Sequence, residues 1–265
     1  MSATEHDAVV RRSFERQVGL FRGEDSPFAR RPASTLAWLD PLDHDMIALD
    51  VACGAGHAAE VAAPLVRQVV GVDLTPSLLD VAAERLRHAG IANVLLQVGN
   101  AADLPFLDAS FDLVFCRSAL HHFASPGAPV AEMARVCRPG GRVVVADMVA
   151  PSAELRESFD ELHRRIDPSH AGVLLEAELA ELLRSTVGAI SHAETSDPFT
   201  IGLDRMLKGV ADREGVEAVL EAELAGGRPT GFHPVRVDDD VTVSFTTAVV
   251  HAVRAGAEPG SSGLG

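Results

Sequence analysis

The sequence predicts a doubly wound α/β fold, and three observations lead to this prediction. Between residues 46 and 150, short β-branched runs alternate with segments whose apolar residues recur at helical spacing. The short runs are almost continuously apolar, which is typical of strands buried on both faces of a parallel sheet. The connections between them are short, and the first run leads into a glycine-rich turn. Helices are therefore expected on both faces of a mostly parallel sheet.

Five strands with intervening helices account for this part of the chain. The strands are expected at residues 46–52, 68–73, 93–99, 111–117 and 141–149. After the second strand, Thr75 and Pro76 form a typical helix start, with threonine as the N-cap and proline as the first helical residue. Another helix pattern, over residues 128–137, ends just before Pro139.

A different rhythm follows Pro151. Helices are expected at residues 153–165, 174–185 and 212–225, and a strand at residues 189–201. Residues 241–254 form one long β-branched run, expected to be a single strand, although period-two alternation is confined to its first half. At the chain ends, residues 9–21 have apolar side chains at helical spacing, whereas residues 255–265 are rich in glycine and serine and expected to be flexible.

Composition narrows the class of partner. The formal net charge of −15 argues against a nucleic-acid partner, which would need a basic surface patch. No apolar run reaches the roughly 20 residues that span a bilayer, and the N-terminus lacks signal-peptide features, so a soluble, cytoplasmic protein is expected. The cysteines, Cys53, Cys116 and Cys137, show neither disulfide nor metal-ligand spacing, and no other cluster suggests a metal site.

The turn after the first strand carries the strongest chemical signal. Gly54 and Gly56 allow a sharp turn and a close approach of backbone to a ligand, toward which the next helix points its N-terminal amides. Asp73, at the end of the second strand, can accept hydrogen bonds from both hydroxyls of a ribose. The same pattern fits the dinucleotide-binding fingerprint, so an NAD(P)-dependent oxidoreductase stays open on these residues alone.

Six segments in order resemble the motifs of class I S-adenosylmethionine-dependent methyltransferases of the ubiquinone/menaquinone-biosynthesis type. They are LDVACGAG (49–56), VGVDLTP (70–76), GNAADLPF (99–106), SFDLV (110–114), RSALHHF (117–123) and RVCRPGG (135–141). The resemblance implies a seven-stranded, mostly parallel Rossmann-like sheet whose last strand, residues 241–254, runs antiparallel between strands five and six. It also implies a helical lid insertion and S-adenosylmethionine as the cofactor.

The resemblance assigns the cofactor site to residues at the strand ends: Asp50, Ala52, Gly54, Gly56, Asp73, Leu74, Asn100, Ala101, Arg117 and Ser118. Asp50 would face the methionine amino group, Asp73 the ribose and Leu74 the adenine ring. Asn100 and Ala101 would meet the adenine edge. Asn100 departs from the family pattern, which usually has aspartate there; its amide oxygen can still accept a hydrogen bond, so weaker binding is expected.

Candidate catalytic residues follow the fourth and fifth strands. A base is needed where the acceptor arrives protonated, and His121 or His122 could take such a proton near neutral pH, with Asp147 orienting a histidine or contacting substrate. Helix capping or packing is the alternative role for the histidines, and a helix N-cap or a solvated strand end is the alternative for Asp147. The Asp-Pro-Ser-His turn at residues 167–170 resembles a small-molecule subgroup, which makes His170, together with His122, a candidate for substrate binding.

These features predict methyl transfer from S-adenosylmethionine to a small-molecule acceptor, by O- or C-methylation of a quinone precursor or a specialised metabolite. The alternatives are the oxidoreductase and a non-catalytic module that binds S-adenosylmethionine. The expected organisation is an N-terminal helical cap (1–45), a cofactor-binding core (46–150), a substrate lid with the C-terminal strands (151–254) and a tail (255–265). A monomer or homodimer is expected, with no stable membrane insertion.

Overall fold

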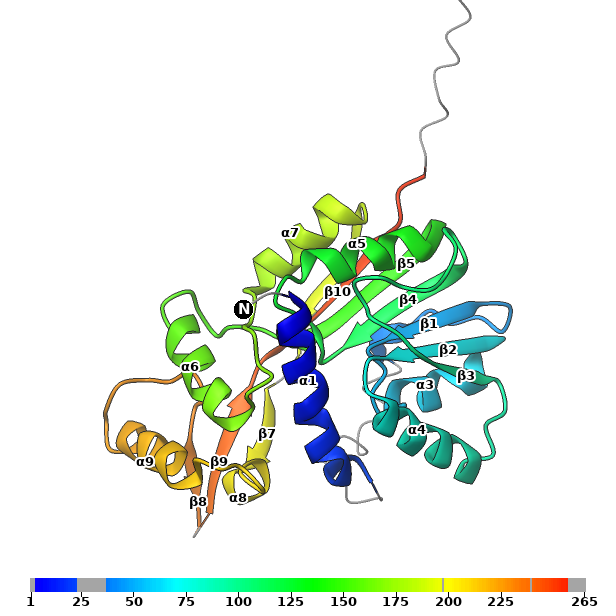
Figure 1. Ribbon diagram of the computed structural model, residues 1–265. Coiled ribbons are helices and arrows are strands. Elements are labelled where there is room, and N and C mark those ends of the chain that lie inside the picture. Colours follow the sequence, from blue (N-terminus) through cyan, green and yellow to red (C-terminus); the bar gives the residue numbers. More distant parts are fainter. Residues whose placement is uncertain (1–2, 23–36, 197, 239, 257–265) are drawn as a thin grey trace, which may run out of the picture.

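The computed structural model describes residues 3–22, 37–196, 198–238 and 240–256, and a seven-stranded mixed sheet forms its centre (Figure 1). The strand order is β3-β2-β1-β4-β5-β10-β6. Strands β1 to β5 pair in parallel, whereas β10 runs antiparallel to both β5 and β6. The predicted doubly wound fold with an antiparallel last strand is therefore confirmed.

The first five strands lie close to their predicted positions. They are β1 (Ile47–Val51), β2 (Gln68–Asp73), β3 (Val94–Val98), β4 (Phe111–Arg117) and β5 (Cys137–Met148). Strand β5 begins four residues earlier than predicted, because residues 137–140 already belong to it. The order β3-β2-β1-β4-β5 places β1 beside β4, so the sheet reverses its direction of winding between these two strands.

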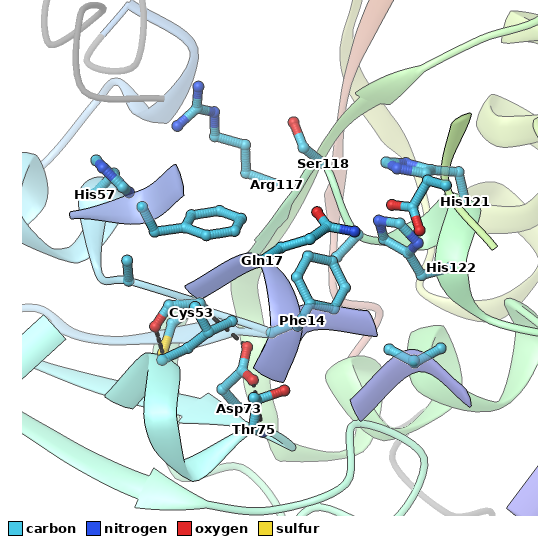
Figure 2. A pocket seen from close by; sticks show the side chains of 18 of the residues that line it. Phe14, Gln17, Cys53, His57, Asp73, Thr75, Arg117, Ser118, His121 and His122 are labelled. Carbon is cyan, nitrogen blue, oxygen red and sulfur yellow. Dashed lines mark hydrogen bonds between the residues drawn. The ribbon is translucent and has the colours of Figure 1, made fainter. Parts of the chain in front are cut away.

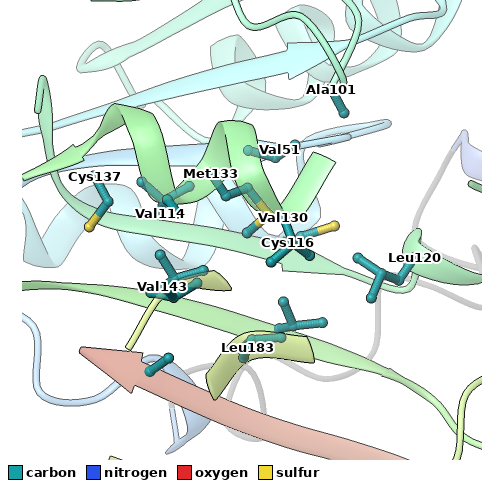
Figure 3. Close-up of a cluster of buried hydrophobic side chains, with 14 of the residues drawn as sticks. Val51, Ala101, Val114, Cys116, Leu120, Val130, Met133, Cys137, Val143 and Leu183 are labelled. Atoms are coloured by element: carbon teal, nitrogen blue, oxygen red, sulfur yellow. The ribbon is translucent and has the colours of Figure 1, made fainter. Parts of the chain in front are cut away.

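Helices cover both faces of the sheet. Helices α5 (Gly127–Val136) and α7 (Glu176–Thr186) pack on one face, where Val130, Met133 and Leu183 contact side chains such as Val114 and Val143 (Figure 3). On the other face, α3 (His57–Ala62), followed by the short 3-10 helix η2 (Ala63–Leu65), packs alanines against β1, β2 and β4. Helix α4 (Pro76–His88) follows β2 and lies against α3. Alternate residues of each central strand supply the two cores.

Two predicted strands are each divided between different sheets, so their prediction as single strands was wrong. The run 241–254 forms β9 (Asp240–Phe245) and β10 (Thr247–Val253), and 189–201 forms β6 (Ile190–Thr195) and β7 (Phe199–Gly202). Strands β7, β9 and β8 (Val235–Val237) make a separate antiparallel sheet. The alternating half of the run, β9, is buried on one face, whereas β10 is buried on both. Alternation thus marked the boundary.

The segment between β5 and β10, where a helical lid insertion was expected, contains helices and also a small sheet. Helices α6 (Arg156–Ile166), α8 (Leu203–Met206) and α9 (Arg213–Leu224) enclose, with the small sheet, a core of their own. Phe159, Leu220 and Phe232 are fully buried in it. Figure 1 shows this insertion on the side of the main sheet to which β4 and β5 run.

The N-terminal segment forms α1 (Ala3–Gln17) and the 3-10 helix η1 (Val18–Phe21). Phe14, Val18 and Phe21 pack against the turn after β1 and against α4, and Arg85 of α4 donates to the Phe21 carbonyl at 3.2 Å. In Figure 1, α1 crosses between α4 and the insertion. Most of the predicted tail, residues 257–265, lies outside the described residues. Of the helices in the described ranges, none is long and apolar enough to cross a membrane.

Gly56 lies where the start of α3 packs closely against α4. Its φ is +75°, and a Cβ placed there would lie 3.0 Å from the Cβ of Ala82. Gly90 has a similar φ of +70°, but a Cβ there would meet no described heavy atom within 4 Å. We expect Gly90→Ala to lower the free energy of unfolding by about 1 kcal/mol and Gly56→Ala by about 2–3 kcal/mol, because overpacking adds to backbone strain. Urea denaturation of both variants measures the difference, and equal losses would contradict the packing role.

Candidate active site

A cavity of about 660 Å³ lies between the carboxyl edge of the main sheet, helix α1 and the insertion. Its position is the one at which open α/β sheets bind ligands, and its size lies within the range of ligand pockets. All but one of the residues predicted for the cofactor site line this cavity. They are Asp50, Ala52, Gly54, Asp73, Leu74, Asn100, Ala101, Arg117 and Ser118. Gly56, although described, is not part of the wall.

The exits of the two central strands have left-handed backbone. Ala52 and Gly54 follow β1 with φ of +55° and +52°, and Ser118 follows β4 with φ of +50°. Such values are uncommon for residues other than glycine and carry strain, which surrounding contacts must maintain. Both strained exits face the cavity, so the chain turns sharply at the point where backbone meets the empty volume.

The carboxylate of Asp73 holds the first of these turns. One oxygen accepts the backbone N–H of Gly54 and the other that of Thr75, both at 2.8 Å. Burial raises the pKa of Asp73, and the hydrogen bonds from Thr75 and Gly54 oppose that rise. The side chain therefore has a fixed orientation at the wall of the cavity, as Figure 2 shows. A carboxylate has further lone pairs, which a ligand hydroxyl can use.

Asp50 is a buried acid with an unused acceptor. Its side chain is 2% exposed, and its Oδ2 has no hydrogen-bond partner among the described residues. Burial raises the pKa of Asp50 to about 8, although the nearby Arg117 charge opposes the shift. Buried polar atoms are nearly always paired in folded proteins. Because Asp50 lines the cavity, an unpaired acceptor here points to a ligand that brings a donor, such as an amino group.

His121 and Asp147 form a buried pair at the exit of β4. The Nδ1 of His121 lies 2.6 Å from Oδ1 of Asp147, and the other carboxylate oxygen accepts backbone N–H groups of residues 119–121. Burial by itself would lower the pKa of His121, but the Asp147 charge and hydrogen bond outweigh it, so this pKa is raised. His121 lines the cavity, whereas Asp147 lies behind it.

His122 lies beside His121 but has a different environment. It belongs to the 3-10 helix η3 (Leu120–His122), and its ring contacts Phe14 of α1 edge-on, with centroids 5.0 Å apart. Its Nδ1 lies 3.1 Å from the Ser169 hydroxyl. Burial and the neighbouring His121 lower the pKa of His122 to about 3, so this ring is neutral at physiological pH. Figure 2 shows both histidines, with Phe14 close to His122.

His170, predicted to bind substrate, lies in the structure behind the cavity wall. Its Nε2 is 2.7 Å from Oδ1 of Asp160. Its ring stacks on the ring of His163 of α6, with the ring centroids 4.2 Å apart and an interplanar angle of 11°. It is His163 that lines the cavity. Burial, with His170 and His121 nearby, lowers the pKa of His163 well below its usual range. His163 was not among the residues predicted for the site, and its one signal in the sequence is its place one turn after Phe159 on the buried face of α6.

Helix α1, part of the expected N-terminal cap, supplies another wall, although none of its residues was predicted for the site. Asp7, Val10, Phe14 and Gln17 line the cavity, and Asp7 accepts a hydrogen bond from the Asn100 side chain at 2.9 Å. The Asn100 oxygen accepts the backbone N–H of Ala102. His57, which was not among the residues predicted for the site, also lines the cavity, as do apolar residues between β5 and β10: Ile166, Phe199, Ile201, Met206, Val210 and Phe245.

Metal ligation has no support in the part of the chain that the structure describes, where no group of three or more His, Cys, Asp and Glu side chains could hold an ion. The cavity offers an acceptor carboxylate, a histidine with a raised pKa and an apolar wall.

The His121–Asp147 pair predicts a particular dependence on pH. The raised pKa of His121 stabilises the fold fully below pH 6.5, its ordinary pKa, and this stability is lost as the pH rises through the raised pKa. The lowered pKa of Asp147 stabilises the fold fully above pH 3.8, its ordinary pKa, and this stability is lost as the pH falls through the lowered pKa. Asp147→Asn should therefore be most destabilising, relative to the unchanged protein, between these two values. We also expect the pKa of His121 to fall below 6.5 in this variant, because burial remains and the charge is gone. Histidine NMR titration checks the pKa, and an unchanged value would contradict the pairing.

Comparisons with known proteins agree with this geometry. A family model described as a methyltransferase domain matches residues 49–145. The uncharacterized methyltransferase YcgJ of Bacillus subtilis is 40% identical over 134 residues, which cover 50% of this chain and 52% of YcgJ. The crystal structure of YcgJ superposes with a TM-score of 0.73 and 27% identity, over 85% of this chain and 98% of YcgJ.

Two further relatives have named activities. A demethylmenaquinone methyltransferase of Clavibacter sepedonicus is 32% identical over 193 residues, covering 70% of this chain and 74% of that protein. The O-methyltransferase resE of Aspergillus sclerotiorum is 36% identical over 144 residues, covering 52% and 53%. This chain spans about half the length of the curated relatives that it matches first. By its sheet topology, its methyltransferase domain and these relatives, the chain belongs to the class I S-adenosylmethionine-dependent methyltransferases.

Proposed function

We propose that the protein transfers a methyl group from S-adenosylmethionine to a small-molecule acceptor bound against the insertion. One observation carries this proposal: a single cavity joins the acidic strand ends, Asp50 and Asp73, to His121 and to an apolar wall from the insertion. The acidic part suits a cofactor with an amino group and a ribose. The apolar part suits a small acceptor, because such pockets bury most of their ligand's surface.

The residues present fit the cofactor. Bound S-adenosylmethionine supplies an electrophilic methyl group on a sulfonium centre. Asp50, whose Oδ2 has no partner in the described structure, would accept from the methionine amino group, and Asp73 would accept from the ribose hydroxyls. Leu74 and Ala101 would contact the adenine, with Ala52, Gly54, Arg117 and Ser118 completing the wall. We assign Gly56 to the packing of α3 on α4 and not to contact.

Proton removal from the acceptor would fall to His121. Since Asp147 engages Nδ1, the proton on that nitrogen is held and Nε2 becomes the nitrogen that can take a proton from a phenol, alcohol or enolisable carbon. Asp147 is then a positioning residue. His122 would contribute packing, because its lowered pKa makes it a poor base. His163 would touch the acceptor, with His170 held behind it by Asp160.

An O- or C-acceptor with an acidic proton follows from these roles, and quinone precursors and specialised metabolites both have such groups. The demethylmenaquinone methyltransferase and the O-methyltransferase among the relatives support this range of acceptors. The monomer or homodimer expected from the sequence stays part of the proposal, as does the division into cap, core and lid.

The proposed function is tested with isotope-labelled S-adenosylmethionine and a panel of phenols, quinols and enolisable ketones. We expect labelled product and S-adenosylhomocysteine from the unchanged protein. His121→Ala should lower kcat by about 100-fold or more, the usual contribution of a base, with S-adenosylhomocysteine affinity within about twofold. His192→Ala, at an exposed histidine of β6, is the control. Binding of NAD(P)H in preference to S-adenosylmethionine would overturn the proposal, and cofactor binding without any turnover would indicate a non-catalytic module.

Asp50 makes cofactor binding dependent on a proton. With a pKa of about 8, Asp50 is mostly protonated at pH 7 in the free protein. An ammonium group beside it favours the carboxylate, so binding should release a proton. Calorimetry at pH 7 in two buffers of different ionisation enthalpy measures this release. We expect up to one proton for the unchanged protein and none for Asp50→Asn; equal proton release in both would exclude Asp50 as the group.

A further inference from the structure

We propose that Asp7 of helix α1 recognises the exocyclic amino group of the cofactor's adenine. This inference rests on the proposed function, because it takes S-adenosylmethionine to occupy the cavity. With Asp50 at the methionine end and Asp73 at the ribose, the adenine would lie against Leu74 and Ala101, at the exits of β2 and β3. Asp7 lines this same cavity and is hydrogen-bonded to Asn100, the residue next to Ala101.

The hydrogen bonds of Asn100 show why its amide is the weaker candidate. A backbone N–H only donates and a carboxylate only accepts, so the bonds to Ala102 and Asp7 fix both ends of the amide. Its oxygen already accepts from Ala102, which leaves it one neutral lone pair, and one N–H of its nitrogen donates to Asp7. The carboxylate of Asp7 has several lone-pair sites, of which Asn100 uses one. It can therefore accept from the adenine amino group, and a charged acceptor makes the stronger bond.

Helix α1 is held at points on both sides of Asp7, so its carboxylate has a defined position. On one side, His6 contacts the His122 carbonyl through Nε2 at 2.7 Å. On the other, the Ser13 hydroxyl donates to Asp167 of the insertion at 3.1 Å. The Asn100 amide, which donates to one oxygen of Asp7, orients the Asp7 carboxylate. The acceptor for adenine thus comes from a helix residue that lies 93 residues before Asn100 in the sequence.

The test compares S-adenosylhomocysteine with S-inosylhomocysteine, in which a 6-oxo group replaces the amino donor. We expect the unchanged protein to bind the adenosyl compound at least about tenfold more tightly, the worth of one charge-assisted hydrogen bond. Asp7→Asn keeps the side-chain shape and can still accept from Asn100, but it turns an amide donor toward the purine. This variant should lose or reverse the preference. Glu15→Gln, on the exposed side of α1 beside Arg11, should leave it unchanged.

A swap of the two side chains gives the decisive variant. Asp7→Asn combined with Asn100→Asp keeps one amide and one carboxylate in contact, and should restore at least half of the lost preference on a logarithmic scale. Asn100→Asp alone places two carboxylates together and should weaken binding of both compounds. A preference that persists in Asp7→Asn would overturn the role of Asp7 while leaving the proposed function intact. Failure of the unchanged protein to bind S-adenosylhomocysteine at all would instead overturn the proposed function.

Discussion

The carboxylate of Asp73 at the end of β2 accepts the backbone N–H of Gly54 in the turn after β1, and the cavity's acidic wall depends on this bond. The strands β1 and β4 are neighbours at the point where the winding of the sheet reverses. A similar bond operates on the other side of that point. Asp147, near the end of β5, accepts the N–H groups of residues 119–121 after β4. Each central turn is therefore held by an acid from the strand outside it.

These two acids explain how strained backbone persists at the sheet edge. Ala52 and Ser118 adopt positive φ next to the turns that Asp73 and Asp147 hold. Strain of this kind costs of order 1–3 kcal/mol for each residue and survives where surrounding contacts over-determine the geometry. The same burial that strengthens these hydrogen bonds raises the pKa of Asp50, which has no such bonds at its Oδ2 from the described residues. The edge thus contains two acids whose hydrogen bonds hold the turns, Asp73 and Asp147, and one acid, Asp50, whose Oδ2 can accept from a ligand.

Helix α1 and the insertion convert this edge into a cavity. Alone, the carboxyl ends of β1, β2 and β4 would form an open shelf. Phe14 on His122, together with the bond between Ser13 and Asp167, fastens α1 to both the core and the insertion. His163 enters from α6, backed by the stack with His170. Residues from three separate parts of the chain therefore surround the position at which methyl transfer is proposed to occur.

Local sequence patterns were sufficient to predict much of the main sheet and its ligand-binding edge. Residues 46–150 carry the alternation of strands and helices, the glycine turn and Asp73, and their positions follow from periodicity and from the rule that ligands meet parallel strands at their carboxyl ends. The family motifs in the same region then favoured a methyltransferase over an oxidoreductase. Within the run 241–254, the alternating half coincides with β9 and the almost continuously apolar half with β10.

Other features depended on contacts that no local pattern contains. The bond between Asp7 and Asn100, the stack of His163 on His170 and the bond between Ser13 and Asp167 join residues that are distant in sequence or belong to different elements. The periodicity of apolar residues indicates which face of a helix is buried, but chain topology and packing determine which residues contact that face. The sequence by itself therefore determined the sheet, its ligand-binding edge and the family. The tertiary structure alone decided which side chains close that edge into a site.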